Sequence, residues 1–166
     1  MTLAARPASP DDAPMITQIY NEGIADRVGT FETRPRAVQD VLAWFDGRHP
    51  IVVVEADGQI VAFASTSSYR NRDAYAGIAE FSVYVARHAR GKGAGAVAMR
   101  ALIDAVKPAG IWKLVSRIFV ENDASRRLMA SMGFREVGIY EKHAKLDGEW
   151  RDVVIVERLI RENQLD

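Results

Sequence analysis

A strand that runs through a glycine-rich, basic turn into a helix is the feature that most constrains this chain. Residues 78–85 are mostly β-branched and aromatic with few turn formers, which favours a strand. Glycine, arginine and lysine then alternate up to Gly95. The apolar residues that follow recur at helical spacing, at Met99, Leu102, Ile103 and Val106. The sequence therefore predicts a β-strand joined directly to an amphipathic helix, a unit of mixed α/β proteins.

The glycine-rich turn has the features of a phosphate-binding site. First-turn amides of a helix have no partner inside the helix, and that end carries partial positive charge. Arg87, Arg90 and Lys92 add three cationic side chains. A structural turn with solvated basic residues is the alternative, but the order of strand, turn and helix favours a phosphate-bearing ligand.

Two well-known phosphate loops fit this turn less well. The pattern GxxxxGK[ST] is absent. Gly93, Gly95 and Ala98 formally match the dinucleotide pattern GxGxxA, but Glu121, the nearest candidate for the acidic ribose ligand, comes late. The loop also lies mid-chain rather than at the opening of a strand–helix–strand unit. A CoA- or dinucleotide-binding module without catalysis stays open as an alternative.

Length and composition predict one globular domain spanning residues 1–166. Lysine plus arginine and aspartate plus glutamate both number 22, which argues against a general nucleic-acid binder. The chain has no cysteine, and its three histidines lack metal-ligand spacing, so we expect no metal. No apolar run approaches the roughly 18 residues of a membrane span. The N-terminus lacks a signal-peptide core, so we expect a cytoplasmic location and no membrane partner.

The remaining elements follow from periodicity and turn residues. Ser9-Pro10-Asp11-Asp12 predicts a helix start, with Ile16, Ile19, Tyr20 and Gly23 on the buried face. Further helices are predicted at about 35–48, with Val38, Val41, Leu42 and Phe45 inward, and at 124–132. Strands are predicted at 3–6, 51–54, 60–65, 112–120, 134–145 and 150–159, with hairpin turns at Asp57-Gly58 and Asp147-Gly148. Because a helix connects strand 78–85 to strand 112–120, these two should be parallel within an otherwise antiparallel sheet.

Two linked segments resemble the GNAT family of acetyl-CoA-dependent N-acetyltransferases. Residues 90–95, RGKGAG, resemble the family's R/Q-x-x-G-x-G/A pyrophosphate loop. Residues 122–128, NDASRRL, followed by Met132-Gly133-Phe134, resemble its N-x-x-A/S-x-x-L…x-G-F segment. The resemblance implies an α/β (α+β) fold with a mixed, mostly antiparallel central sheet, one splayed parallel strand pair and about four flanking helices.

The resemblance also implies that acetyl-CoA lies in the gap between the two parallel strands. The backbone of the first strand, the amides of the turn and the side chain at the start of the next helix should contact it. The residues expected to bind acetyl-CoA are Val83, Tyr84, Val85, Arg90, Gly91, Lys92, Gly93, Ala94, Gly95, Ala96, Asn122 and Ser131. Asn122 is also placed to cap a helix, and both roles are compatible.

Glu80 is the candidate catalytic base. Acetyl transfer needs a neutral amine, yet an α-amino group with a pKa of about 8 is mostly protonated at neutral pH. In a regular strand Glu80, Ser82 and Tyr84 share one face, and a carboxylate inside an apolar strand is costly unless it is paired or used. The alternative is that Glu80 is solvated or paired with an arginine. The run EFSVYV at 80–85 resembles the E-x-S/T-V-Y-V strand of phosphinothricin-type acetyltransferases, whose glutamate is the proposed base.

Three more segments resemble the phosphinothricin and methionine sulfoximine acetyltransferase subgroup: TFET at 30–33, YRNRDAY at 69–75 and GEWRDV at 148–153. Members acetylate the α-amine of small amino acids such as phosphinothricin, methionine sulfoximine or methionine sulfone. Arginine forks suit the carboxylate and polar head of such substrates. The expected substrate-binding residues are Phe31, Glu32, Arg70, Asn71, Arg72, Tyr75, Glu80, Phe81 and Ser82.

One position departs from the family pattern. Many members carry a tyrosine after the N-x-x-A-x-x-L segment to protonate the leaving thiolate, and here Met129 stands there. Tyr84, Tyr140 or a water are the alternative donors, or the amine proton passes directly to sulfur. A different acceptor, such as a polyamine, an antibiotic or a protein N-terminus, also stays open. Relatives are homodimers, so the resemblance implies a two-fold dimer.

Overall fold

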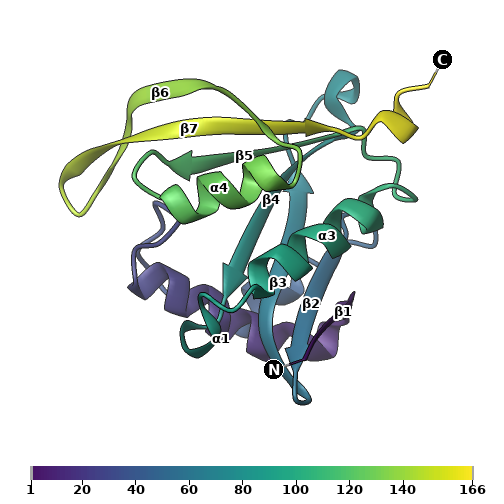
Figure 1. Ribbon diagram of the computed structural model, residues 1–166, viewed down its shortest axis with the longest axis vertical. Helices are drawn as coiled ribbons and strands as arrows, with labels where there is room; N and C mark the ends of the chain where they lie inside the picture. The colour runs from purple at the N-terminus through teal and green to yellow at the C-terminus, as the bar shows by residue number, and fades with distance from the viewer. Residues whose placement is uncertain (1, 166) are drawn as a thin grey trace.

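The computed structural model describes residues 2–165, in which a seven-stranded sheet forms the centre of the molecule (Figure 1). The strand order is β1-β2-β3-β4-β5-β7-β6, and each neighbouring pair is antiparallel except β4–β5. This confirms the predicted mixed sheet with one parallel pair. The strands are β1 (Leu3–Pro7), β2 (Ile51–Ala56), β3 (Gln59–Ser68), β4 (Ile78–Val85), β5 (Lys113–Phe119), β6 (Arg135–Leu146) and β7 (Glu149–Leu159).

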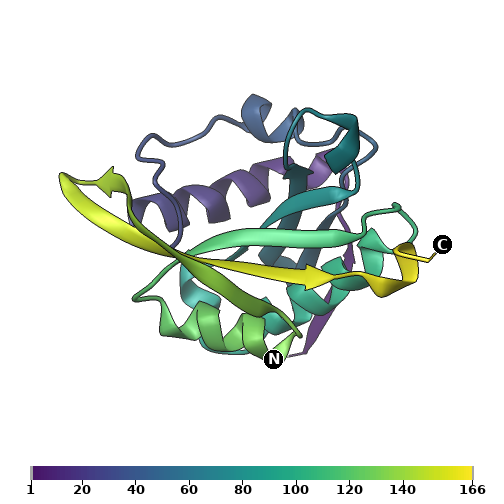
Figure 2. The same cartoon turned by 90° about the horizontal axis from the view of Figure 1, so that it is seen from above.

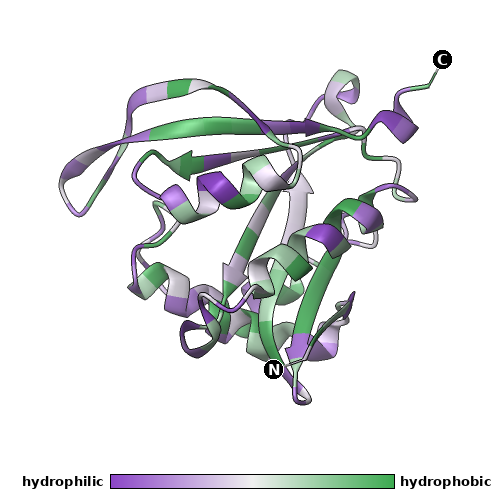
Figure 3. Cartoon of the chain, viewed as in Figure 1, coloured by the Kyte–Doolittle hydropathy of each residue, from purple (hydrophilic) through white to green (hydrophobic). Residues whose placement is uncertain are grey.

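Four helices cover the two faces of the sheet in the described residues (Figure 2). Helices α1 (Ala13–Ala25) and α2 (Val38–Leu42) lie on one face, and α3 (Ala94–Val106) and α4 (Asp123–Ser131) on the other. The apolar positions predicted for α3, from Met99 to Val106, are buried against the sheet. Apolar residues accordingly dominate the central strands, while the outer side of α3 is polar (Figure 3). Within residues 2–165, no helix combines the length and apolar character that crossing a bilayer requires.

The two short hairpins form as the sequence predicts. Asp57 and Gly58 have φ of 52° and 79°, and Asp147 and Gly148 have φ of 51° and 82°. Positive φ at both central residues is the type I′ geometry, whose twist matches that of the flanking strands. These turns set the register of β2 with β3 and of β6 with β7.

The first helix begins slightly later than predicted. The Asp12 carboxylate accepts a hydrogen bond from the Ser9 N–H at 2.8 Å, as expected of a helix start. Residues Pro10–Asp12, however, form a 3-10 turn, and α1 starts at Ala13. The predicted inward residues of this helix are buried, apart from Tyr20, which is partly exposed.

The long helix predicted at 35–48 is wrong: α2 spans only Val38–Leu42. Beyond it the Asp46 carboxylate accepts the backbone N–H groups of Arg48 and His49 at 2.8 Å each, and Gly47 adopts a left-handed φ of 74°. These local bonds replace a helical ladder, and Leu42, predicted to be buried, is exposed. In this segment, local side-chain hydrogen bonds end the helix although the apolar residues recur at helical spacing.

The parallel strands β4 and β5 separate part-way along their length. Their pairing runs from Ile78–Lys113 to Glu80–Val115, yet β4 continues to Val85 and β5 to Phe119. Just beyond the last pair, the Ser116 hydroxyl donates to the Phe81 carbonyl at 3.0 Å. The gap that opens past this point is the place where the site described next is built.

Candidate active site

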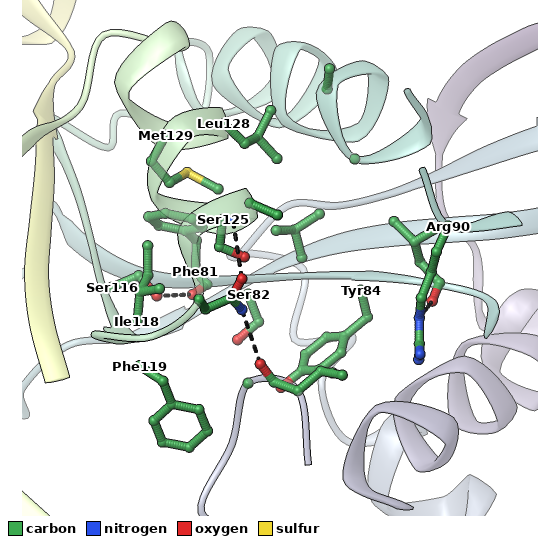
Figure 4. A pocket seen from close by; sticks show the side chains of 18 of the residues that line it. Phe81, Ser82, Tyr84, Arg90, Ser116, Ile118, Phe119, Ser125, Leu128 and Met129 are labelled. Carbon is green, nitrogen blue, oxygen red and sulfur yellow. Dashed lines mark hydrogen bonds between the residues drawn. The ribbon is translucent and has the colours of Figure 1, made fainter. Parts of the chain in front are cut away.

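A cavity of about 640 Å³ occupies the gap between β4 and β5 (Figure 4). The glycine-rich turn and the start of α3 close one end, α4 lies over it, and the loop after α1 borders it. Its lining is Val28, Gly29, Phe81, Ser82, Val83, Tyr84, Val85, Arg90, Gly91, Gly93, Gly95, Ala96, Ser116, Arg117, Ile118, Phe119, Asn122, Ala124, Ser125, Leu128 and Met129.

The turn at one end of the cavity is suited to a diphosphate. Gly91 and Gly93 have φ of 78° and 89°, and apart from each glycine and its two chain neighbours no described residue has an atom within 4 Å of where a Cβ would stand. The helical ladder of α3 begins with Val97 N–H donating to the Gly93 carbonyl at 3.2 Å. The amides before Val97 therefore lack helical partners, and the glycines leave room for a ligand to approach the backbone, which suits the diphosphate of acetyl-CoA.

An acidic residue at the end of α1 holds the turn in place. The Asp26 carboxylate accepts two hydrogen bonds from Arg87, at 2.9 Å each, and one from Arg90 at 2.8 Å. Glu22 accepts the backbone N–H of Arg87 at 2.9 Å. The hydrogen bonds from Arg87 and then Arg90 hold the pKa of Asp26 at about 2. Arg90, expected to bind the cofactor directly, thus also anchors the turn to α1.

Asn122 serves as the predicted helix cap and also lines the cavity. Its side-chain oxygen accepts the Ser125 N–H at 3.1 Å, and its amide group donates to the Val28 carbonyl at 3.0 Å. The second bond ties the loop after α1 to the start of α4. Asn122 therefore shapes the cavity through the two segments it joins.

Most of the residues expected to bind acetyl-CoA line this cavity. Those are Val83, Tyr84, Val85, Arg90, Gly91, Gly93, Gly95, Ala96 and Asn122. Lys92, Ala94 and Ser131 are not in its lining: Lys92 is exposed, Ala94 is buried, and the Ser131 hydroxyl donates to the Leu128 carbonyl at 2.6 Å.

Glu80 sits where the parallel pairing ends, and it is paired with an arginine. Its Oε1 accepts a hydrogen bond from Arg117 Nη2 at 2.9 Å, and the two side chains are 34% and 49% exposed. On the other side of the guanidinium, Arg117 Nη1 lies 3.4 Å from His143 Nε2. Arg117 lines the cavity and Glu80 lies just outside its lining. The arginine partner that the sequence left unidentified is therefore Arg117.

The other residues expected to bind substrate lie in several different places. Phe81 and Ser82 line the cavity, while Phe31 packs edge-on against Phe119 with ring centroids 5.1 Å apart. Glu32 pairs with Arg36 at 2.8 Å. Arg70, Asn71, Arg72 and Tyr75 lie exposed on the loop between β3 and β4, outside the cavity lining, with the Arg70 guanidinium 4.9 Å from the Tyr69 ring centroid.

Sequence reasoning missed the whole β5 side of the site. Ser116, Ile118 and Phe119 of β5 line the gap opposite β4, and Leu128 and Met129 cover it from α4 (Figure 4). Arg117 of β5 also belongs to the lining. The implied splayed parallel pair could have indicated this side of the site, because the strand that separates from β4 must line the same gap. Val28 and Gly29 had no such signal, because the contact from Asn122 that brings them there is long-range.

The candidate proton donors for the leaving thiolate are placed differently. Met129 is buried over the cavity and has no proton to give. Tyr84 lines the cavity, and burial raises its pKa above the ordinary value, so the phenol keeps its proton at neutral pH. Tyr140 is half exposed on β6 and outside the cavity lining.

The acetyltransferase (GNAT) family model matches residues 16–134 of this chain, which include both β4 and the glycine-rich turn. The chain belongs to the GNAT acetyltransferase family. It is accordingly an N-acetyltransferase with acetyl-CoA as its co-substrate, and the open, amide-lined end of the cavity suits that molecule.

Two curated relatives and one solved structure are similar over nearly the whole chain. Phosphinothricin N-acetyltransferase of Streptomyces coelicolor is 34% identical, covering 92% of this chain and 94% of the relative. The L-methionine sulfoximine/L-methionine sulfone acetyltransferase of Pseudomonas aeruginosa is 31% identical, covering 95% and 94%. A GNAT phosphinothricin acetyltransferase from Sinorhizobium meliloti, solved in complex with acetyl-CoA, superposes with a TM-score of 0.88 at 29% identity, covering 96% and 89%.

Proposed function

We propose that this GNAT enzyme acetylates the α-amine of a small amino acid or analogue, with phosphinothricin, methionine sulfoximine and methionine sulfone as candidate acceptors. The observation that carries the proposal is the position of Glu80, at the point where β4 and β5 separate beside the cavity. The relatives named for those three compounds support the choice of acceptor.

Glu80 would act as the base that removes a proton from the acceptor. The α-ammonium group has a pKa of about 8 and is mostly protonated at neutral pH, so it must lose a proton before it can attack. A carboxylate can take that proton directly or through one water. When bound, acetyl-CoA supplies an activated thioester. Within the described residues, β4 has no ladder partner on its β5 side beyond Glu80, so its free amides there can orient and polarise that group.

Replacing Glu80 with glutamine tests the proposed base. We expect turnover at neutral pH to fall by about 100-fold or more, with partial recovery at high pH, where more of the amine is already neutral. Acetyl-CoA affinity should change little, because Glu80 lies outside the cavity lining. Glu162→Gln, which removes a surface carboxylate 3.8 Å from Lys107, is the matched control. Unchanged turnover in Glu80→Gln would remove Glu80 from the mechanism.

The acceptor is tested with a substrate panel read by release of free CoA. The panel contains methionine sulfone, methionine sulfoximine, phosphinothricin and several polyamines. We expect turnover with the amino acids and little with the polyamines, whose positive charges would meet Arg117 at the cavity. Activity confined to polyamines would overturn the choice of acceptor and leave the acetyltransferase assignment intact.

Three further features belong to the same proposal. Residues 1–166 form one acetyltransferase domain, which the continuous sheet from Leu3 to Leu159 supports, although Met1 and Asp166 lie outside the described residues.

The enzyme works as a homodimer, supported by apolar side chains exposed on β6 and β7. It acts in the cytoplasm without nucleic-acid or membrane partners, in keeping with its zero net charge.

A further inference from the structure

Arg117 and Glu80 form a pair of opposite charges on one face of the sheet at the mouth of the cavity. Glu80 and Val115 are register partners, so Glu80 and Arg117, two residues further along β5, point to the same side. This side carries Phe119, Phe31 and α1, whereas the diphosphate turn leads into α3 on the opposite face. The charged pair therefore faces the side from which an acceptor can approach the cavity.

The hydrogen bond between Arg117 and Glu80 can be replaced at low cost by a hydrogen bond to a ligand. A single hydrogen bond, from Nη2, joins Arg117 to Glu80, and both side chains are substantially exposed. Exposed ion pairs of this kind contribute little net stability. A guanidinium has five N–H donors, so Arg117 can present a two-pronged donor face to an incoming carboxylate.

We infer that Arg117 binds the α-carboxylate of the acceptor amino acid, exchanging Glu80 for the substrate and leaving Glu80 to receive the α-ammonium group. The inference rests on the proposed function and deepens it. An α-amino acid carries its negative and positive groups on the same carbon. A carboxylate held by Arg117 thus brings the ammonium group beside Glu80, which lies 2.9 Å from the guanidinium. The positive charge of Arg117 thus matches the α-carboxylate of the amino acid, and the negative charge of Glu80 matches its α-ammonium group.

This assignment changes the role expected of the loop arginines. Arg70 and Arg72 are exposed outside the cavity lining, and Arg70 lies over the Tyr69 ring. They are left to meet the polar head of the acceptor's side chain. Arg117 instead selects for the amino-acid backbone, because an amine without a carboxylate gives the guanidinium no partner in place of Glu80.

The test compares methionine sulfone with its primary carboxamide, which differs in lacking the negative charge. Wild-type enzyme should prefer the free acid in kcat/KM by roughly tenfold or more, the contribution of a charge-assisted hydrogen bond. Arg117→Gln should lose most of this preference through a raised KM for the acid, with little change for the carboxamide. Arg117→Lys, which keeps the charge but not the fork, should fall between the two.

The control is Arg135→Gln, which removes an exposed arginine that likewise pairs with a glutamate, Glu157, at 2.8 Å, but outside the cavity lining. It should keep the wild-type preference. A wild type without preference, or an Arg117→Gln enzyme that retains it, overturns the inference about Arg117 alone. Equal losses with both compounds also overturn it, since they point to a structural role. If methionine sulfone is not accepted, the same comparison is made with an amino acid of the panel that is. If wild-type enzyme acetylates no amino acid of the panel, the proposed function itself fails, and this inference with it.

Discussion

Asp26 is a single side chain on which the geometry of the phosphate-binding turn depends. It accepts hydrogen bonds from both Arg87 and Arg90, and the Nε of Arg90 donates to the Val85 carbonyl at 3.3 Å. The carboxylate thus orders the turn before any ligand arrives. Ordering a loop in advance improves affinity because the entropy cost is not incurred on binding.

We predict that Asp26→Asn raises the KM for acetyl-CoA roughly threefold to tenfold, with a smaller change in kcat, because the turn must then be ordered during binding. Steady-state kinetics with varied acetyl-CoA measure this. Asp104→Asn is the control, since Asp104 is exposed on α3 and pairs with Lys107 instead. An unchanged KM would show that the turn keeps its shape without Asp26.

The ion pairs of Asp26 also predict a dependence of stability on pH. Arg87 and Arg90 lower the pKa of this carboxyl from 3.8 to about 2 in the folded protein. A depressed folded-state pKa gives a contribution that is complete above the unfolded value and is lost as pH falls toward the folded one. The difference in melting temperature between wild type and Asp26→Asn should therefore be constant above about pH 5 and shrink toward pH 2. A constant difference down to pH 2 would contradict the assigned pairing.

At the scale of elements, α1 and β4 approach so closely that only glycine fits between them. A Cβ on Gly23 would stand 2.6 Å from Cδ1 and 2.8 Å from Cε1 of Tyr84. The Tyr84 ring cannot easily retreat, because it packs against Phe63 at 5.6 Å and Tyr20 at 5.1 Å between centroids. The contact sets the height of α1 above the strand that carries Glu80.

We predict that Gly23→Ala destabilises the protein by about 1–3 kcal/mol, the usual cost of overpacking, even though alanine favours a helix by about 1 kcal/mol over glycine. Chemical denaturation measures the difference. Gly138→Ala on β6 is the control, because no described atom lies within 4 Å of its Cβ position. A Gly23→Ala variant as stable as wild type would mean that α1 shifts freely over β4.

The elements that the sequence predicted correctly are those with strong local signals. The type I′ turns at Asp57-Gly58 and Asp147-Gly148, the apolar face of α3 and the β4–turn–α3 unit all follow from neighbouring residues. The long helix at 35–48 failed because side-chain bonds from Asp46 end it locally, which periodicity does not reveal.

The parts of the site that could not be predicted depend on contacts between distant segments. The Arg117–Glu80 pair joins residues 37 positions apart, and the Asn122–Val28 bond spans 94. No local pattern marks arginine at position 117 as a partner of Glu80, since that requires knowing where the parallel pairing stops. Family motifs supplied the β4 and turn residues. The splay of the parallel pair pointed to β5 as the opposite wall, but which β5 residues line it came only with the fold.

For the molecule as a whole, the hairpin of β6 and β7 projects beyond the rest of the sheet (Figures 1 and 2). β6 is an edge strand, and it exposes Val137, Ile139 and Tyr140 by 45%, 51% and 53%, with Trp150 of β7 exposed by 55%. Edge strands with exposed apolar side chains are prone to pair with another chain. A closed two-fold dimer would cover such a surface on both copies at once.

We predict that the wild type is a dimer in light scattering and that Ile139→Asp shifts it toward monomer, because a charge would have to be buried without a partner at the interface. Leu42→Asp on α2 is the matched control: its side chain is 41% exposed but lies on a different element, so the dimer should persist. Since β7 also pairs with β5, the strand that carries Arg117, loss of the dimer should raise the KM for the amino acid more than the KM for acetyl-CoA. A monomeric wild type would contradict the dimer, and a dimeric Ile139→Asp would place the interface elsewhere.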